Sequence, residues 1–327
     1  MSDLCASPRP SRRLHRAAGL LATAGLAVTL AACGGGSTAG SAVTTPPAAA
    51  SAASSAEQVS SSLADSPACT ALRAEHPDLV GTTQTNALNP HTPGYEVIDQ
   101  EDPTKFQGFD IDLGNAIASC LGFTVDYVAV GFSELIPTVA SGQADWIVSN
   151  LYATKERAAG GVDFISYSKV FDGILVAKDN PKTITGIDTS LCGLTVALNK
   201  GYVEVPLVEG VGPDCVAAGK PEPTVSLFDS SADCVQAILA GRADAYMNDV
   251  NTVTRFIAEH PADLSSAETV MLDYTIGIGV PTGKTAFRDA IQAALTAVQS
   301  TGLQAELATK WQLDANAVAE PTILTAD

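Results

Sequence analysis

The sequence predicts an α/β protein made of two similar lobes with a ligand site between them. The main observation is an internal repeat: residues 133–145 match residues 233–244 around the pattern A-x-G-x-A-D or a near variant. In each copy an amphipathic helix ends at a glycine, Gly142 or Gly241, that suits the left-handed position after a helix. A short apolar strand follows each glycine. A helix-to-strand unit that occurs twice indicates two α/β lobes.

The strands of the repeat also locate a candidate site. The strand at residues 146–149 and the strand at 245–247 each lead to a polar residue eight positions after the glycine, Asn150 and Asp249. Ligands of open α/β sheets bind at the carboxyl ends of strands. The two residues are therefore predicted to face one another across a cleft. The alternative is that both are ordinary turn residues that end strands.

Hydrophobic periodicity predicts the elements around the repeat. A helix over residues 110–121 ends at Gly122, and an alternating strand follows at residues 123–127. The next helix is expected after Phe132, with Ser133 as its N-cap. Further strands are expected at 174–177 and 194–198, and C-terminal helices at 287–295 and 304–311.

The charge balance excludes several classes of partner. The chain has 18 Lys and Arg residues against 36 Asp and Glu residues, a net charge of −18. A nucleic-acid partner is not expected, because phosphate binding needs clustered cations. Four arginines and one acid lie within residues 1–32, so the remainder carries 14 cations and 35 anions. A basic membrane-binding face is therefore also disfavoured.

The N-terminus has the pattern of an export signal. Residues 9–16 are basic, and residues 17–32 form an apolar run shorter than the roughly 20 residues of a spanning helix. An uncleaved anchor is the alternative. The run Leu30-Ala31-Ala32-Cys33 resembles the lipobox of bacterial lipoproteins, which implies a signal peptide over 1–32 and lipidation of Cys33. Residues 33–64 are rich in Ala, Ser, Gly and Pro and are predicted to form a flexible tether.

The cysteines left after Cys5 and Cys33 favour disulfides, since export permits them. Cys192 and Cys215 bracket a short insert and form the best-supported pair, and Cys69 with Cys120 is a second candidate. Cys234 fits a helical apolar pattern and is expected to be a buried free thiol. No Cys or His spacing suits a metal site. The three His residues beyond the predicted signal peptide, His76, His91 and His260, do not suggest a catalytic triad.

Several ordered motifs carry a family resemblance. They are G-F-D-I-D-L at 108–113, F-S-E-L-I-P at 132–137, S-G-Q-A-D at 141–145, T-K-E-R at 154–157 and V-D-F at 162–164. Together, across residues 78–313, they resemble the amino-acid-binding family of bacterial extracellular solute-binding proteins, family 3, which serve ABC importers. The resemblance implies the type II periplasmic-binding-protein fold, with two α/β lobes joined by two crossing strands.

The resemblance also implies boundaries for the lobes. The crossings are expected near Phe171-Asp172 and residues 276–280. The first part of lobe 1 then covers 65–172, lobe 2 covers 173–277, and residues 278–327 return to lobe 1 as helices and a tail.

Arg157 is the leading candidate for ligand binding. Thr154 is predicted to cap a helix whose first turn holds Arg157, where a cation opposes the helix dipole unless an anion contacts it. The guanidinium fork suits a carboxylate, and the family motif T-x-x-R uses its Arg on the ligand α-carboxylate. The alternative is a solvated Arg157 paired with Asp163. The resemblance assigns the ligand ammonium to Asp249, in the other lobe.

Further positions follow from the resemblance alone. Phe132 matches an aromatic packed on the ligand, with a core position as the alternative, and Asn150 and Tyr152 match residues that contact the ligand termini. The family usually has Ser or Thr in place of Tyr152. In lobe 2, Tyr202 and Val203 precede a helix whose amides can bind an anion. Thr83 stands where many binders of basic amino acids carry Asp, and the loop at 84–93 is expected to be longer than usual.

These expectations describe a monomeric binding lipoprotein rather than an enzyme. It has no cofactor, captures an amino acid or derivative by lobe closure, and delivers it to an ABC permease from the outer face of the cytoplasmic membrane, at the cell surface or in the periplasm. A dehydratase on the same fold is one alternative, although it needs a general acid or base in the cleft. A protein that presents its ligand to a sensor is the other. The sequence leaves the side chain of the ligand open.

Overall fold

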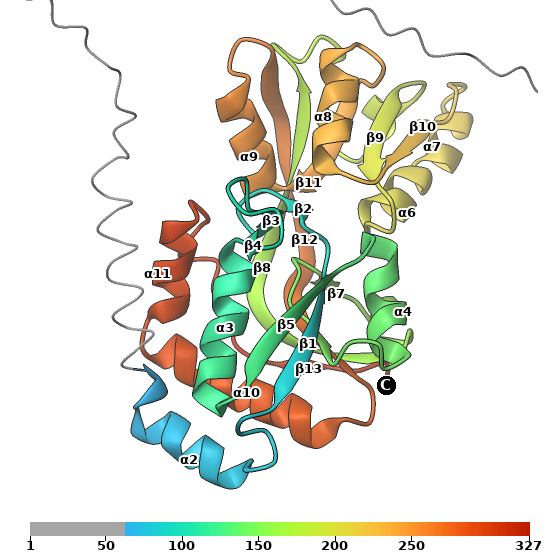
Figure 1. Ribbon diagram of the computed structural model, residues 1–327. Coiled ribbons are helices and arrows are strands. Elements are labelled where there is room, and N and C mark those ends of the chain that lie inside the picture. Colours follow the sequence, from blue (N-terminus) through green and yellow to red (C-terminus); the bar gives the residue numbers. More distant parts are fainter. Residues whose placement is uncertain (1–62) are drawn as a thin grey trace, which may run out of the picture. The chain divides into compact units, whose positions relative to one another are not determined.

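A ten-stranded sheet runs through both lobes of the computed structural model, which describes residues 63–327 (Figure 1). Its path is β10 (Thr224–Phe228), β9 (Thr195–Asn199), β11 (Ala245–Asp249), β8 (Val162–Ala177), β12 (Leu264–Pro281), β6 (Trp146–Ile147), β1 (Thr83–Leu88) and β5 (Thr124–Ala129). Off this path, β13 (Ile323–Leu324) pairs with β8, and β7 (Tyr152–Ala153) pairs with β12. The parallel strands form two groups, one in each lobe. The two-lobed α/β fold expected from the sequence is thereby confirmed.

The first lobe packs helices around the strands β1, β5 and β6. Its helices are α2 (Pro67–Glu75), α3 (Phe109–Leu121), α4 (Leu135–Ala140), α5 (Lys155–Ala158), α10 (Thr285–Ser300) and α11 (Leu303–Lys310). Helix α10 contacts α2, α3 and α11, and its apolar side recurs at helical spacing from Ala290 to Val298. This side joins the core around Trp146. Helix α3 ends where Gly122 takes a positive φ of 83°, as its sequence predicts.

One helix start in this lobe differs from the prediction. The 3-10 turn η1 (Phe132–Glu134) precedes α4, so Ser133 lies inside the turn and is not an N-cap. The carboxylate of Glu134 accepts a hydrogen bond from the Gly131 amide at 3.1 Å and satisfies the end of the turn instead.

The second lobe is built on β9, β10 and β11. Its helical elements are η2 (Thr189–Leu191), α6 (Glu204–Glu209), α7 (Gly212–Ala217), α8 (Ser231–Leu239) and α9 (Val250–Glu259). The repeat predicted from the sequence is visible after α4 and α8. Gly142 and Gly241 take φ values of 77° and 65°, and their amides donate to Val139 and Ile238 at 3.0 and 2.9 Å. Both helices therefore end in the same way before their strands.

The two long strands β8 and β12 connect the lobes. In β8, residues 172–176 pair with β11 of the second lobe, whereas residues 164–165 pair with β13. The pairing of β12 with β8 shifts register at three places, between Ser266 and Glu268, between Met271 and Thr275, and between Ile276 and Gly277. The last of these shifts lies at the start of the second crossing expected at 276–280, where Ile276 also pairs with Tyr152 of β7. The exact lobe boundaries at 172/173 and 277/278 stay predictions.

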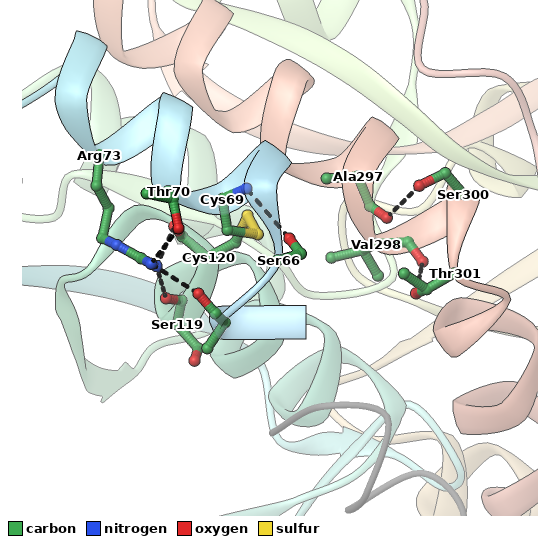
Figure 2. The surroundings of a disulfide bond; sticks show 11 residues. Ser66, Cys69, Thr70, Arg73, Ser119, Cys120, Ala297, Val298, Ser300 and Thr301 are labelled. Atoms are coloured by element: carbon green, nitrogen blue, oxygen red, sulfur yellow. Dashed lines mark hydrogen bonds between the residues drawn. A yellow bond between two sulfur atoms is a disulfide. The ribbon is translucent and has the colours of Figure 1, made fainter. Parts of the chain in front are cut away.

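Two disulfides hold helices and loops in place, and they are the two predicted pairs. Cys69 of α2 bonds to Cys120 of α3, and Cys192 bonds to Cys215 of α7 (Figure 2 shows the first). The Arg73 guanidinium supports the first bond by donating to the carbonyls of Ala64 and Cys120 at 2.7 and 3.1 Å. Cys234 is a buried free thiol, as expected.

The segment after β1 forms a small sheet of its own. Strands β2 (His91–Thr92), β3 (Glu96–Ile98) and β4 (Phe106–Gln107) pair antiparallel. The expected loop at 84–93 is therefore wrong for residues 84–88, which belong to β1. Thr83 opens β1 and its hydroxyl lies 2.9 Å from that of Thr124. Thr83 is at the amino end of its strand, whereas a ligand site lies at the carboxyl ends.

The folded part begins earlier than the predicted tether boundary. Leu63 is 1% exposed and belongs to the core around α2 and α3, so residues 63–64 are not tether. An apolar side chain followed by the α2 helix explains the difference, because burial of Leu63 adds to that core. The predicted signal peptide at 1–32, Cys5, the predicted lipidation site Cys33 and the rest of the predicted tether lie outside the described residues. Among residues 63–327, no helix combines the length and apolar character needed to cross a membrane.

Candidate functional site

Arg157 bridges the two lobes through backbone carbonyls. Thr154 caps α5 as predicted, since its hydroxyl accepts from the Arg157 amide at 3.1 Å. The guanidinium donates through Nη1 to the Tyr152 carbonyl of the first lobe and through Nη2 to the Gly201 carbonyl of the second, both at 2.8 Å. Burial lowers the pKa of Arg157, while the nearby Glu204 acts in the opposite direction. The cation thus sits at the junction of the lobes without a carboxylate in hydrogen-bond contact.

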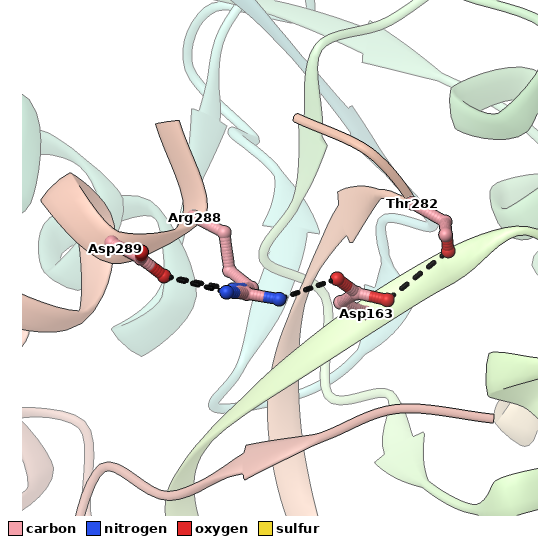
Figure 3. Close-up of polar contacts among 4 residues, drawn as sticks. All are labelled: Asp163, Thr282, Arg288 and Asp289. Atoms are coloured by element: carbon pink, nitrogen blue, oxygen red, sulfur yellow. Dashed lines mark hydrogen bonds and ion pairs between the residues drawn. The ribbon is translucent and has the colours of Figure 1, made fainter. Parts of the chain in front are cut away.

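Asp163 is occupied by a different arginine. Arg288 Nη1 donates to Asp163 Oδ2 at 2.8 Å, and the Thr282 hydroxyl donates to Oδ1 at 3.1 Å (Figure 3). The second face of Arg288 binds Asp289. The alternative pairing of Arg157 with Asp163 is therefore not present.

Asn150 and Asp249 meet at the carboxyl ends of their strands. Asp249 is 2% exposed and caps α9, because its carboxylate accepts from the amides of Asn251 and Thr252 at 3.0 and 3.1 Å. Burial raises the pKa of Asp249, and hydrogen bonds, including one from the Asn150 side chain, act in the opposite direction. Asn150 has a positive φ of 40°, which Asn tolerates better than most residues. The structure thus brings together the two residues that the repeat singled out.

The side chain of Tyr152 contacts a carboxylate on a strand that connects the lobes. Its phenol donates to Asp172 Oδ1 at 2.8 Å, while its backbone carbonyl receives Arg157. Asp172 lies on the crossing strand β8, opposite Asp249 in the ladder. The side chain of Tyr152 therefore reaches the connection between the lobes.

Aromatic side chains close one edge of the junction. The ring centroids of Phe132 and Tyr202 are 4.2 Å apart, and the Arg157 guanidinium carbon is 5.4 Å from the centre of the Phe132 ring. Phe132 also packs on the core of its own lobe, as the alternative interpretation expects, and its packing on a ligand stays a prediction. Arg157, Tyr202 and Val203 line a groove of about 760 Å³ that both lobes form.

Four buried carboxyl groups in this region were not singled out from the sequence. The first two form a pair: Glu96 of β3 and Asp110 of α3 are both 0% exposed, and their side chains hydrogen-bond to each other. Burial is the main cause that raises the pKa of Glu96 well above its ordinary value. Burial also raises the pKa of Asp110 to about 6, although bonds from Glu96, Tyr167 and the Asn150 amide act in the opposite direction. Two nearby ionised carboxylates repel each other, so the charge of Asp110 acts in the same direction as burial on the pKa of Glu96.

The second pair joins Asp172 to Glu204 of α6. Glu204 is 0% exposed, and burial followed by the charge of Asp172 raises its pKa well above the ordinary value. Burial raises the pKa of Asp172 to about 6. Among the four, Asp110 lies within the G-F-D-I-D motif, Asp172 lies at the expected first crossing, and Glu204 directly follows Val203. None of these positions indicates burial.

Comparison with known protein families shows the family of this chain. The model of the bacterial extracellular solute-binding proteins, family 3, matches residues 85–314. The chain belongs to this family. Among curated relatives, it is 29% identical over 176 residues to the arginine-binding protein ArgT of Corynebacterium glutamicum, covering 54% of this chain and 56% of ArgT. It is 27% identical over 214 residues to the glutamine-binding protein GlnH of Bacillus subtilis, covering 63% of this chain and 73% of GlnH.

Solved structures of the family share the fold. An ancestral arginine-binding protein bound to arginine matches with a TM-score of 0.64 and 26% identity, covering 70% of this chain and 97% of that structure. A mutant of ArgBP from T. maritima matches with a TM-score of 0.59 and 27% identity, covering 75% and 99%. The two-lobed fold is therefore that of extracellular amino-acid-binding proteins.

Proposed function

We propose that this protein captures an amino acid or a close derivative between its lobes and delivers it to an ABC permease. The observation that carries the proposal is the placement of one cation and one anion on opposite lobes: Arg157 on the first and Asp249 on the second. A zwitterion can then bind the guanidinium through its carboxylate and Asp249 through its ammonium. Such a ligand favours the closed arrangement of the lobes, which a permease can distinguish from the open one.

The other site residues support the two ends of the ligand. Asn150 lies beside Asp249 at the ammonium end. Phe132 and Tyr202 supply apolar surface, and Val203 precedes α6 next to the guanidinium. Two of the relatives described above are named for arginine and for glutamine. They support an amino acid as ligand and do not agree on its side chain.

We further propose that the protein acts by binding and not by turnover, as a lipid-anchored monomer. The relatives are named as binding proteins, which supports this reading over a dehydratase. The lipobox-like sequence at Cys33 supports anchoring on the outer face of the cytoplasmic membrane. Mass spectrometry of the mature protein tests the anchor: we expect a diacylated or triacylated N-terminal Cys33, and an unmodified N-terminus contradicts it.

Ligand screening tests the binding function directly. We expect one or more of the common amino acids and their derivatives to raise the melting temperature of the purified protein, because a ligand that binds only the folded state stabilises it. Mass spectrometry of ligand retained through purification gives a second, independent reading. If no amino acid or derivative binds, or if a prephenate-like acid is converted, the proposed function is wrong.

A further inference from the structure

Arg255 of α9 reaches from the second lobe to the first. Its Nη2 donates to the main-chain carbonyl of Trp311, the residue that ends α11, at 2.8 Å. The Arg255 side chain is half-buried, and none of the ion pairs between residues 63–327 includes it. The two helices lie on the same side of the molecule, at the left in Figure 1. Arg255 is thus bonded to the opposite lobe and not to a neighbouring carboxylate.

The first lobe holds the acceptor in place by its own contacts. The indole Nε1 of Trp311 and the Nζ of Lys310 both donate to Asp112 Oδ2 of α3, at 2.6 and 2.8 Å. Carbonyls at the end of a helix lack partners within that helix, and a cation suits this end of the helix dipole. A guanidinium from the second lobe therefore supplies a donor that the end of α11 needs.

A second contact between the lobes lies one helical turn away on α9. Asn251 is four positions before Arg255 and thus on the same side of the helix. Its Nδ2 donates to the Tyr95 phenol of the first lobe at 3.3 Å. Gly94 has a φ of 94°, and a Cβ there would lie 2.9 Å from Arg255 Nη2 and 3.1 Å from Leu313 Cδ2. The first lobe therefore packs its backbone directly on the guanidinium.

This contact is separate from the proposed ligand groups but lies on the same helix as one of them. Asp249 caps α9, so a movement of α9 against the first lobe also moves Asp249. On the other side of the junction, Arg157 of the first lobe donates to the Gly201 carbonyl of the second. Turning of the lobes about β8 and β12 changes the distance from Arg255 to Trp311, because α9 and α11 belong to different lobes. A hydrogen bond is lost beyond about 3.5 Å.

We propose that Arg255 is a positioning residue that holds the two lobes in the arrangement that binds the ligand, without touching the ligand itself. The inference rests on the proposed function. The bond from Arg255 to Trp311 stabilises this arrangement against the open one. The observed affinity of a ligand depends on the fraction of protein in the competent arrangement. Arg255 therefore raises the affinity and slows the release of the bound amino acid.

Arg255→Met tests the residue, because methionine keeps much of the apolar stem and removes every donor. Arg242→Met, at an exposed position of the second lobe, is the matched control. The probes for isothermal titration calorimetry are arginine and glutamine, together with any amino acid or derivative that raises the melting temperature in the screen. We expect Arg255→Met to raise the dissociation constant about five- to tenfold, since a hydrogen bond from a charged group is lost. We expect a change of less than about twofold in Arg242→Met.

Rate measurements separate positioning from a role in folding. The bond forms as the lobes close around an amino acid that has already entered. Stopped-flow measurements of Arg255→Met should therefore show a dissociation rate raised by about the same factor and an association rate changed less than about twofold. Arg255→Lys keeps a charge and a donor, although with a different geometry, and is expected to lose less affinity than Arg255→Met.

Three results overturn the inference and leave the proposed function standing. They are wild-type affinity and dissociation rate in Arg255→Met, a slower association at an unchanged dissociation rate, and a lower stability of the ligand-free variant with unchanged affinity. If Arg255→Met does not fold, wild-type affinity and dissociation rate in Arg255→Lys overturn it equally. Failure of every amino acid and derivative to bind the wild-type protein overturns both the inference and the proposed function.

Discussion

Asp145 and Asp244 hold equivalent strands in the two lobes by the same pair of hydrogen bonds. The Asp145 carboxylate accepts from the Thr85 amide of β1 at 2.8 Å, and the Asp244 carboxylate accepts from the Thr195 amide of β9 at 2.9 Å. Each aspartate also donates its own amide to the carbonyl of the same threonine, at 2.8 and 2.7 Å. The last residue of the sequence repeat is thus a structural connection between a helix end and a parallel strand.

Substitution of either aspartate by alanine should destabilise its lobe. A hydrogen bond to a charged group contributes about 1.5–3 kcal/mol, and we expect each variant to lose about that much free energy of unfolding. Urea unfolding measures the loss. Asp145→Asn keeps an acceptor and is expected to lose less than Asp145→Ala, so equal losses for the two contradict the role of the hydrogen bond.

Arg157→Ala should abolish tight ligand binding. We expect the dissociation constant of any amino-acid ligand to rise about 30-fold or more, because the buried carboxylate end loses its charged partner. Arg242→Ala removes an exposed arginine and is the control. Calorimetry measures both. Because the guanidinium also bonds the Gly201 carbonyl, small-angle scattering of ligand-free Arg157→Ala should show a more open average arrangement of the lobes. An unchanged affinity in Arg157→Ala contradicts the site assignment.

Arg288→Ala should destabilise the first lobe more than Asp289→Ala does. Asp163 is 4% exposed, and its partner Arg288 joins the start of α10 to β8. Removal of one partner of a buried ion pair leaves an uncompensated charge and costs about 3–5 kcal/mol in buried sites. Asp289 is exposed, and its loss is expected to cost less than about 1 kcal/mol. Thermal or urea unfolding of both variants provides the comparison.

The stability of the ligand-free protein should fall as pH rises from about 4 through about 6. Burial raises the pKa of Asp110 and Asp172 to about 6, above the ordinary value for Asp, so the folded state binds more protons than the unfolded state in this window. The stabilisation from these two groups is fully present below the pKa that each has in the unfolded chain. It is lost as the pH rises through the pKa that each has in the folded protein. Melting temperatures across this range measure it. Asp110→Asn should flatten the slope, and a slope identical to wild type shows that Asp110 does not titrate there.

Much of the scaffold was predictable because it depends on local patterns. The glycine positions, the Thr154 cap, the α3 and α10 helices and the two disulfides follow from periodicity, capping and spacing. The facing of Asn150 and Asp249 followed from the repeat, since equivalent strands end at equivalent places. Ser133 was misplaced because the preceding 3-10 turn depends on a bond between Glu134 and Gly131 that competes with ordinary capping.

The buried carboxyl groups could not be predicted, because their burial is a tertiary effect. Glu96 lies between the apolar side chains Tyr95 and Val97, and in the small β2-β3-β4 sheet it is Glu96 that is buried whereas Ile98 of the same strand is exposed. Asp172 lies in the long strand β8, and the order of apolar and polar residues along this strand does not indicate that Glu204 of α6 lies beside Asp172. A single acidic residue in a sequence is ordinarily expected at the solvent-exposed surface. Which acidic residues lie next to one another in the folded protein depends on tertiary contacts that the sequence pattern does not show.

The placement of Asp172 on β8 links two properties that are usually separate. This strand is one of the two covalent connections between the lobes, and it also carries Asp172. The Asp172 carboxylate accepts a hydrogen bond from Tyr152, and its pKa is affected by Glu204 and by the charge of Asp249. A change of charge near Asp249 would therefore act on a strand that connects the two lobes. Substitution of Asp172 is therefore expected to change both the charge near Asp249 and the packing of a strand that joins the two lobes.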